Sequence, residues 1–232
     1  MISIKNTKLN LVEFVNSHNV TGTTFDPDKP TIGFARRFVK YKRGDLIFED
    51  IAKLVDISQG NLQIVYAGKA PPSDDFGKGV IKNIIEIVGK LKGEVSVAFI
   101  PNYDMYIGSV LTSGVDVWMN TPRRPREASG TSGMKAAING VPHFSIIDGW
   151  WYEAQPKGGW SIGPEPTNFD LNQQDDSADV QALYSVLKDE VLPDIADIQQ
   201  YVKKMIEAIE NAAFFNTHRM FQEYLDRAYL LK

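Results

Sequence analysis

Residue types that bind phosphate gather in one short stretch of this chain. A turn rich in Gly, Ser and Thr, residues 128–133, leads into Lys135, which begins a segment typical of a helix. Small residues let backbone N–H groups approach a ligand closely, and a helix N-terminus carries about half a positive charge, so together they suit a phosphate. A lysine just inside such a helix has the chemistry to neutralise an anion or to form an imine with an aldehyde cofactor.

A charged segment precedes this turn. Glu127 stands directly before it and follows three arginines, Arg123, Arg124 and Arg126. The plainest alternative for the turn is a Thr or Ser N-cap followed by a surface lysine, but the neighbouring acid and arginines favour a site. The arginines have two interpretations, phosphate binding or anchoring of the loop to nearby carboxylates, and we favour anchoring.

A second basic cluster lies earlier in the chain and comprises Arg36, Arg37, Lys40, Lys42 and Arg43. Taken alone, it is typical of a solvated basic face. The whole chain is acidic, with a formal net charge of −4, which argues against a general nucleic-acid binder. Focal positive clusters on an acidic chain indicate a protein that binds a small anion at a site.

Composition excludes several other classes of protein. The chain has 232 residues and no cysteine, so disulfides, thiolate metal sites and thiol catalysis are excluded. No apolar stretch reaches the roughly 20 residues of a membrane helix, and the first residues lack the apolar run of a signal peptide. We therefore expect a cytoplasmic protein that does not span a membrane.

Strand-like apolar runs alternate with amphipathic segments over much of the chain. We expect strands at 31–38, 61–68, 94–100, 115–120 and 141–148, with helices between them at 42–57, 79–92, 103–114 and 134–139. Five β units joined by helices predict an α/β fold with a doubly wound parallel sheet. A short helix at 9–17 precedes them, and a polar loop and helices at 177–191, 195–213 and 215–231 follow.

The candidate site residues fall after the predicted strands. The first basic cluster follows strand 31–38, Tyr103 follows strand 94–100, the turn at 128–133 follows strand 115–120, and Asp148 ends the last strand. Ligands of such sheets bind at the carboxyl ends of the strands, so we expect these residues to lie along one rim. His143 stands inside an apolar strand and is interpreted as structural.

Three motifs together resemble the C-terminal half of the α-glucan phosphorylases, the glycogen, starch and maltodextrin phosphorylase family. They are EASGTSGMKAAINGVPHFSIIDGWW, FARRFVKYKR and PNYD, and the likeness is to the shorter bacterial and archaeal branch. The resemblance implies the C-terminal half of a glycosyltransferase B-type fold. Together with the pattern of polar and apolar segments, it leads us to divide the chain into a lead-in or linker at 1–29, a Rossmann-like cofactor- and phosphate-binding domain at 30–190 and C-terminal helices at 191–232.

The resemblance also implies a cofactor, pyridoxal 5′-phosphate, and assigns residues to it. Lys135 would form the imine, Tyr103 would line the pocket, and the cofactor phosphate would bind to Thr131, Ser132 and Gly133. Arg37 and Lys42 would hold the cofactor phosphate and the substrate phosphate together. The transferred glucose would be bound by Glu127, Ala128, Ser129 and Gly130. No metal is implied.

The implied reaction moves a terminal α-1,4-linked glucose from a glucan to inorganic phosphate and yields glucose 1-phosphate. In this family the cleft lies between two halves, and the N-terminal half is not in this sequence, so we expect that activity requires it as a partner, in cis or in trans. A homo-oligomer is a further expectation. The alternatives are a non-catalytic anion- or sugar-binding or regulatory module, and half of a sugar-nucleotide-dependent glycosyltransferase.

Overall fold

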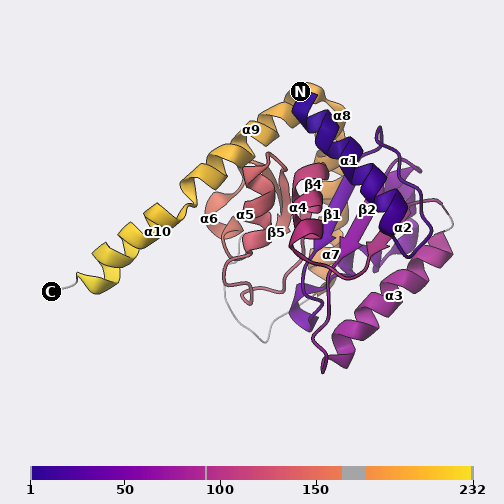
Figure 1. Ribbon diagram of the computed structural model, residues 1–232, viewed down its shortest axis with the longest axis horizontal. Helices are drawn as coiled ribbons and strands as arrows, with labels where there is room; N and C mark the ends of the chain where they lie inside the picture. Colours follow the sequence, from indigo (N-terminus) through magenta and orange to yellow (C-terminus); the bar gives the residue numbers. More distant parts are fainter. Residues whose placement is uncertain (1, 92, 164–175, 231–232) are drawn as a thin grey trace.

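The computed structural model describes residues 2–91, 93–163 and 176–230, which form a six-stranded parallel sheet with helices on both faces (Figure 1). The strands are β1 (Thr31–Ala35), β2 (Gln63–Ala67), β3 (Ser96–Ile100), β4 (Val117–Asn120), β5 (His143–Ile146) and β6 (Gly159–Ile162). Their spatial order is β3-β2-β1-β4-β5-β6. The chain therefore changes direction across the sheet between β1 and β4, which makes their carboxyl ends the expected ligand-binding point.

Helices cover the two faces of the sheet in separate groups. One face packs against α2 (Ile51–Ser58), α3 (Asp75–Leu91) and α7 (Asp176–Val186), and the other against α1 (Ile2–His18), α4 (Met105–Gly114) and α5 (Thr131–Ile138). Apolar side chains point to both faces, as the near-continuous apolar runs of the strands require. The predicted doubly wound α/β fold is confirmed.

The first helix is longer than the short one predicted at 9–17. It spans Ile2–His18, and its Leu11 and Val15 are fully buried in the core beneath α1 and α4. A Cβ on Gly114 of α4 would lie 2.6 Å from Leu11 Cβ, so glycine permits this close helix approach. The predicted division of the chain at residues 29 and 190 stays a prediction.

The single helix predicted for residues 42–57 is wrong in its first half. Two short 3-10 turns, Lys40–Lys42 and Leu46–Phe48, precede α2, whose N-cap Asp50 accepts a hydrogen bond from the Lys53 N–H at 2.9 Å. Arg43 lies between the turns with a left-handed φ of 43°. The backbone bends there while the Arg43 side chain makes buried polar contacts, so tertiary packing overrides the helical pattern.

A sixth strand lies in the segment that the sequence assigns to a polar loop. β6 pairs with β5 at the edge of the sheet, with Gly159 opposite His143. A Cβ on Gly159 would lie 2.0 Å from the His143 carbonyl oxygen, so glycine is required for this pairing. A four-residue strand with glycine first and a buried Trp160 lacks the length and alternation that identify a strand from sequence.

The chain continues through α6 (Trp151–Ala154) and, after α7, through a π-helical turn (Leu187–Val191), α8 (Leu192–Ala196), α9 (Ile198–Phe214), α10 (Thr217–Tyr224) and a last π-helical turn (Leu225–Tyr229). Figure 1 shows α9 beside α5, and α10 extending away from the sheet. The apolar side chains of α10, Met220, Phe221 and Tyr224, are exposed. None of the helices in the described ranges combines the length and apolarity of a membrane span.

Candidate active site

The turn predicted to bind phosphate forms the start of α5. Gly130 is the N-cap and has a left-handed φ of 84°, which favours glycine. Gly133 sits in the first turn of the helix, where a Cβ would lie 2.4 Å from His143 Cε1 and 2.9 Å from Trp150 Nε1. The two glycines therefore have different roles, since one turns the chain into the helix and the other lets the helix approach β5.

An open cavity of about 820 Å³ lies beside this helix start, between α4 and α5. Five candidate residues line it: Arg36, Tyr103, Thr131, Ser132 and Lys135. Lys135 is exposed, whereas Arg36 is buried and Tyr103 is half-buried. Residues from three separate strand ends thus converge, as the sheet topology predicts.

Tyr103 follows β3 and stands against α4. A Cβ on Gly108 would lie 2.7 Å from the Tyr103 hydroxyl, so a glycine in α4 makes room for this ring. Burial raises the pKa of Tyr103, and the carboxylate of Asp104 adds to the increase. The hydroxyl therefore stays protonated near neutral pH and can donate a hydrogen bond.

Glu127 pairs with two basic residues beside the cavity, although neither Glu127 nor Lys42 is among the residues that line it. Glu127 accepts hydrogen bonds from Arg36 Nη2 at 2.6 Å and from Lys42 Nζ at 2.8 Å. Burial alone would raise the pKa of Glu127, but Arg36 and Lys42 outweigh it, and the pKa is lowered. Arg37, the neighbour predicted to hold phosphate, is exposed and is not among the residues that line the cavity.

The DGWW segment positions the residues predicted to bind glucose. Asp148 accepts hydrogen bonds at 2.9 Å from the backbone N–H groups of Glu127 and Gly149, and the Trp150 N–H donates to the Ser129 carbonyl at 2.8 Å. Burial raises the pKa of Asp148, although the two N–H donors oppose the increase. Ala128 and Ser129 line a second cavity of about 440 Å³ toward α10, and Gly130 is buried.

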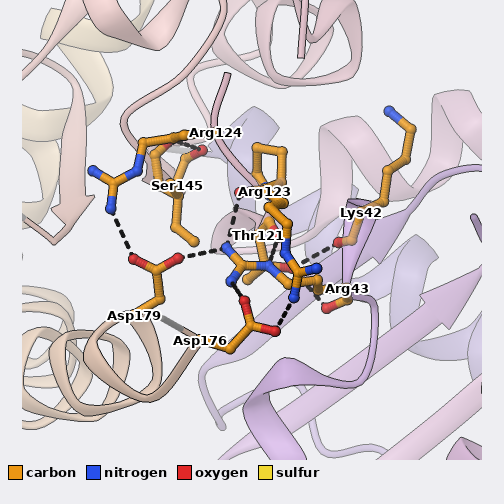
Figure 2. Close-up of polar contacts among 10 residues, drawn as sticks. Lys42, Arg43, Thr121, Arg123, Arg124, Ser145, Asp176 and Asp179 are labelled. Carbon is orange, nitrogen blue, oxygen red and sulfur yellow. Dashed lines mark hydrogen bonds and ion pairs between the residues drawn. The ribbon is translucent and has the colours of Figure 1, made fainter. Parts of the chain in front are cut away.

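The arginines before Glu127 anchor their loop to α7 (Figure 2). Arg123 pairs with Asp176, and Arg124 Nη2 lies 2.9 Å from Asp179 Oδ1. Arg43 joins both acids at 2.7 Å and also donates to the Thr121 and Pro122 carbonyls. The interpretation of Arg123 and Arg124 as anchors is confirmed, and Asp176 and Asp179 are the partners that the sequence did not indicate.

His143 is buried beneath the site and packs against two tryptophans. Its ring centroid lies 5.3 Å from that of Trp150 and 5.0 Å from that of Trp151, and its Nε2 lies 3.2 Å from Asn120 Nδ2. Burial, with Arg36 adding to the effect, lowers the pKa of His143 from 6.5 to about 3. The imidazole is therefore neutral in the folded protein near pH 7 and packs as part of the core.

The lowered pKa of His143 predicts a pH-dependent stability. Below pH 6.5 the His143 imidazole is protonated in the unfolded chain but stays neutral in the folded chain down to about pH 3. The free energy of unfolding should therefore decrease as the pH falls through this range. The contribution is at most about 1.4 kcal/mol per pH unit. Urea unfolding from pH 7 to 4 measures how the free energy of unfolding changes with pH. This slope should be reduced in His143→Asn and unchanged in the matched control His18→Asn at an exposed histidine. An unchanged slope in His143→Asn would contradict the assignment.

Comparison with known proteins gives the family. The carbohydrate phosphorylase family model matches residues 3–159. A maltodextrin phosphorylase of Thermococcus litoralis is 41% identical over 88% of this chain and 25% of its own length. A glycogen phosphorylase of Aquifex aeolicus is 40% identical over 90% of this chain and 31% of its own length.

An uncharacterized protein of Methanocaldococcus jannaschii is 29% identical over 99% of this chain and 43% of its own length. The chain thus spans about a quarter to two fifths of the length of these relatives. The family match covers more than half of the chain and includes the helix α5, the turn before it and the basic residues after β1. The chain belongs to the carbohydrate phosphorylase family.

Proposed function

We propose that this chain is the cofactor-binding half of a cytoplasmic, pyridoxal-phosphate-dependent α-glucan phosphorylase. The completed enzyme would transfer a terminal α-1,4-linked glucose to inorganic phosphate and release glucose 1-phosphate. The observation that carries the proposal is the cavity beside α5, where a lysine, two hydroxyls of a helix N-terminus, a tyrosine and an arginine meet. Family membership supports the reaction class, and the relatives named maltodextrin and glycogen phosphorylase support α-glucan as the substrate.

The residues around this cavity fit pyridoxal 5′-phosphate. The Gly133 N–H donates to the Gly130 carbonyl at 3.0 Å, so the donors that the start of α5 can offer the cofactor phosphate are the N–H groups and hydroxyls of Thr131 and Ser132. Lys135 is exposed on the cavity wall, one helical turn further, and would hold the cofactor covalently. Among the described residues, Arg36 Nη1 is buried and lacks a hydrogen-bond partner, so it has a donor to offer an anion.

When bound, the cofactor would supply a 5′-phosphate that exchanges a proton with the substrate phosphate. Two phosphates about 4 Å apart repel by about 4 kcal/mol per pair of unit charges at an effective dielectric constant near 20. We assign Arg37 and Lys42 to offset this repulsion, and we add Arg36 because, unlike those two, it is among the residues that line the cavity. Glu127 holds Arg36 and Lys42 in place before substrate arrives, which reduces the reorganisation that binding requires.

Glu127 and the turn after it are assigned to the hydroxyls of the transferred glucose. The Glu127 N–H donates to the Asp148 carboxylate and the Ser129 carbonyl accepts from the Trp150 N–H, so the turn is held against the DGWW segment and its polar groups are fixed in direction. A rigid set of donors and acceptors favours one orientation of a sugar ring. The remaining contacts, including those with the rest of the glucan, would come from the N-terminal half.

Complementation tests the function. The purified chain would be mixed with the part of the Thermococcus litoralis relative that lies outside the matched segment, together with pyridoxal phosphate, maltodextrin and phosphate. We expect glucose 1-phosphate only from the mixture, and none when the chain carries Lys135→Ala. If cofactor binds but the mixture with a correctly associated second half stays inactive, the chain is a non-catalytic module. Turnover of a nucleotide sugar without cofactor would instead identify a glycosyltransferase half.

A further inference from the structure

Trp118 is a buried side chain beneath the candidate site to which the proposed chemistry assigns no role. It lies in β4, is fully buried and belongs to the core on the side of the sheet that α4 and α5 cover. Its indole Nε1–H donates a hydrogen bond to Ser132 Oγ, in the first turn of α5, at 3.3 Å. A buried indole N–H needs an acceptor, so this contact ties the Ser132 oxygen to the sheet.

The contact with Trp118 determines what the Ser132 hydroxyl can do. A serine hydroxyl has one proton to donate and two lone pairs that accept, and here one lone pair is directed at the indole N–H. The hydroxyl proton therefore points away from Trp118. Ser132 lines the cavity beside α5, and within residues 2–91, 93–163 and 176–230 its hydroxyl has no acceptor. The hydroxyl is thus a donor that a ligand in the cavity can use.

A second tryptophan–serine pair in this protein shows the same arrangement with the acceptor present. Trp151 Nε1 donates to Ser161 Oγ at 3.0 Å, and the Ser161 hydroxyl donates to Gln155 Oε1 at 2.9 Å. The serine accepts from the indole and gives its own proton to a third group. For Trp118 and Ser132 the third group would be an acceptor in the cavity, and a phosphate oxygen is a strong one.

We propose that Trp118 is a positioning residue for the cofactor phosphate, because its indole N–H fixes the Ser132 hydroxyl so that the hydroxyl donates to a phosphate oxygen. The inference rests on the proposed function, since it takes the phosphate of pyridoxal 5′-phosphate as the ligand at the start of α5. A donor that is oriented beforehand loses less conformational freedom when the phosphate binds. Trp118 is not among the residues that line the cavity, so it acts through Ser132.

A comparison of pyridoxal phosphate with pyridoxal tests this role, because both can form an imine with Lys135 and only the first carries the phosphate. The full chain is titrated with each compound, and the imine absorbance gives two dissociation constants. Their ratio is the readout, since a loss of packing at Trp118 would weaken both ligands alike. The preference for pyridoxal phosphate should fall about tenfold in Ser132→Ala and about fivefold in Trp118→Phe. The double variant should equal Ser132→Ala, because Trp118 acts through a hydroxyl that is then absent.

Two matched controls come from β6. Ser161→Ala removes the hydroxyl of the other tryptophan–serine pair, and Trp160→Phe removes a buried indole whose N–H donates to Asp194 at 2.7 Å. Both should leave the preference for pyridoxal phosphate unchanged. A Trp118→Phe variant with an unchanged preference, or a double variant with a lower preference than Ser132→Ala, would overturn the inference and leave the proposed function in place. A chain that forms no imine even with the second half present would overturn both.

Nuclear magnetic resonance of the indole N–H groups gives a measurement on the chain with Trp118 in place. The four tryptophans give four indole signals, which are assigned through the backbone. The Trp118 signal should shift in Ser132→Ala and again when pyridoxal phosphate binds to the unchanged chain, and it should shift less with pyridoxal. The Trp160 signal should stay in place throughout. A Trp118 signal that responds equally to the two compounds would contradict the role of the phosphate.

Discussion

Replacing Lys135 with alanine should abolish covalent attachment of pyridoxal phosphate while leaving the fold intact. The side chain is exposed on the cavity wall, so its removal creates no core cavity. A surface substitution of this kind changes the unfolding free energy by less than about 0.5 kcal/mol. The unchanged chain, mixed with cofactor and treated with borohydride, should gain the mass of one cofactor on Lys135. The variant should gain none at that position.

The control for this experiment is a second exposed lysine. Lys82 on α3 has a side chain that is 79% exposed, and Lys82→Ala should retain the full adduct. An adduct that persists in Lys135→Ala, mapped to another lysine of the cavity region, would refute the assignment. If the unchanged chain forms no adduct alone, the same comparison is made with the N-terminal half present, where only the Lys135 variant should fail.

Much of the fold could be predicted because the parallel strands are buried on both faces. Runs such as NLQIVYAG and EVSVAFI contain β2 and β3, and their apolar residues pack toward both layers of helices. β6 has no such run. It is recognisable only from its partner, since its pairing depends on Gly159 fitting against the His143 backbone.

The location of the candidate site could be predicted from the sequence more fully than the contacts of its residues. Strand order brings Tyr103, Thr131 and Lys135 to one cavity, and that follows from the position of each residue after its strand. The position of a residue after its strand does not show which of the neighbouring Arg36 and Arg37 faces the site. Arg36 contacts Glu127 and Arg37 is exposed because the chain stays extended just after β1, with the Arg36 and Phe38 N–H groups bonded to the Ala67 and Lys69 carbonyls, so neighbouring side chains point to opposite sides.

The partners of Arg43 show most clearly which contacts the sequence does not predict. The sequence groups Arg43 with the phosphate-binding cluster, but its guanidinium is buried between Asp176 and Asp179, more than 130 residues away. A left-handed residue between two 3-10 turns aims the side chain there. No short-range pattern encodes a contact that depends on where α7 docks.

Replacing Asp179 with alanine should lower the free energy of unfolding by about 3 kcal/mol, the cost of removing one partner from a buried ion pair. Asp179 is 7% exposed and lies 2.7 Å from Arg43 and 2.9 Å from Arg124. Without it, the buried Arg43 keeps Asp176, whose side chain is 41% exposed, as its remaining acidic partner. Urea unfolding followed by circular dichroism measures the change.

The matched control is Asp75→Ala on α3. The Asp75 carboxylate is 94% exposed and pairs with Lys78, so its loss should cost less than about 1 kcal/mol. Equal effects of the two substitutions would mean that the ion pairs of Asp179 with Arg43 and Arg124 add no more to the free energy of unfolding than a surface ion pair does. A large loss at Asp179 alone would mean that the loop before Glu127 is held by α7, because Arg43 and Arg124 connect the acid to that loop. The position of the catalytic candidates would then depend on a helix that contributes no residue to the cavity beside α5.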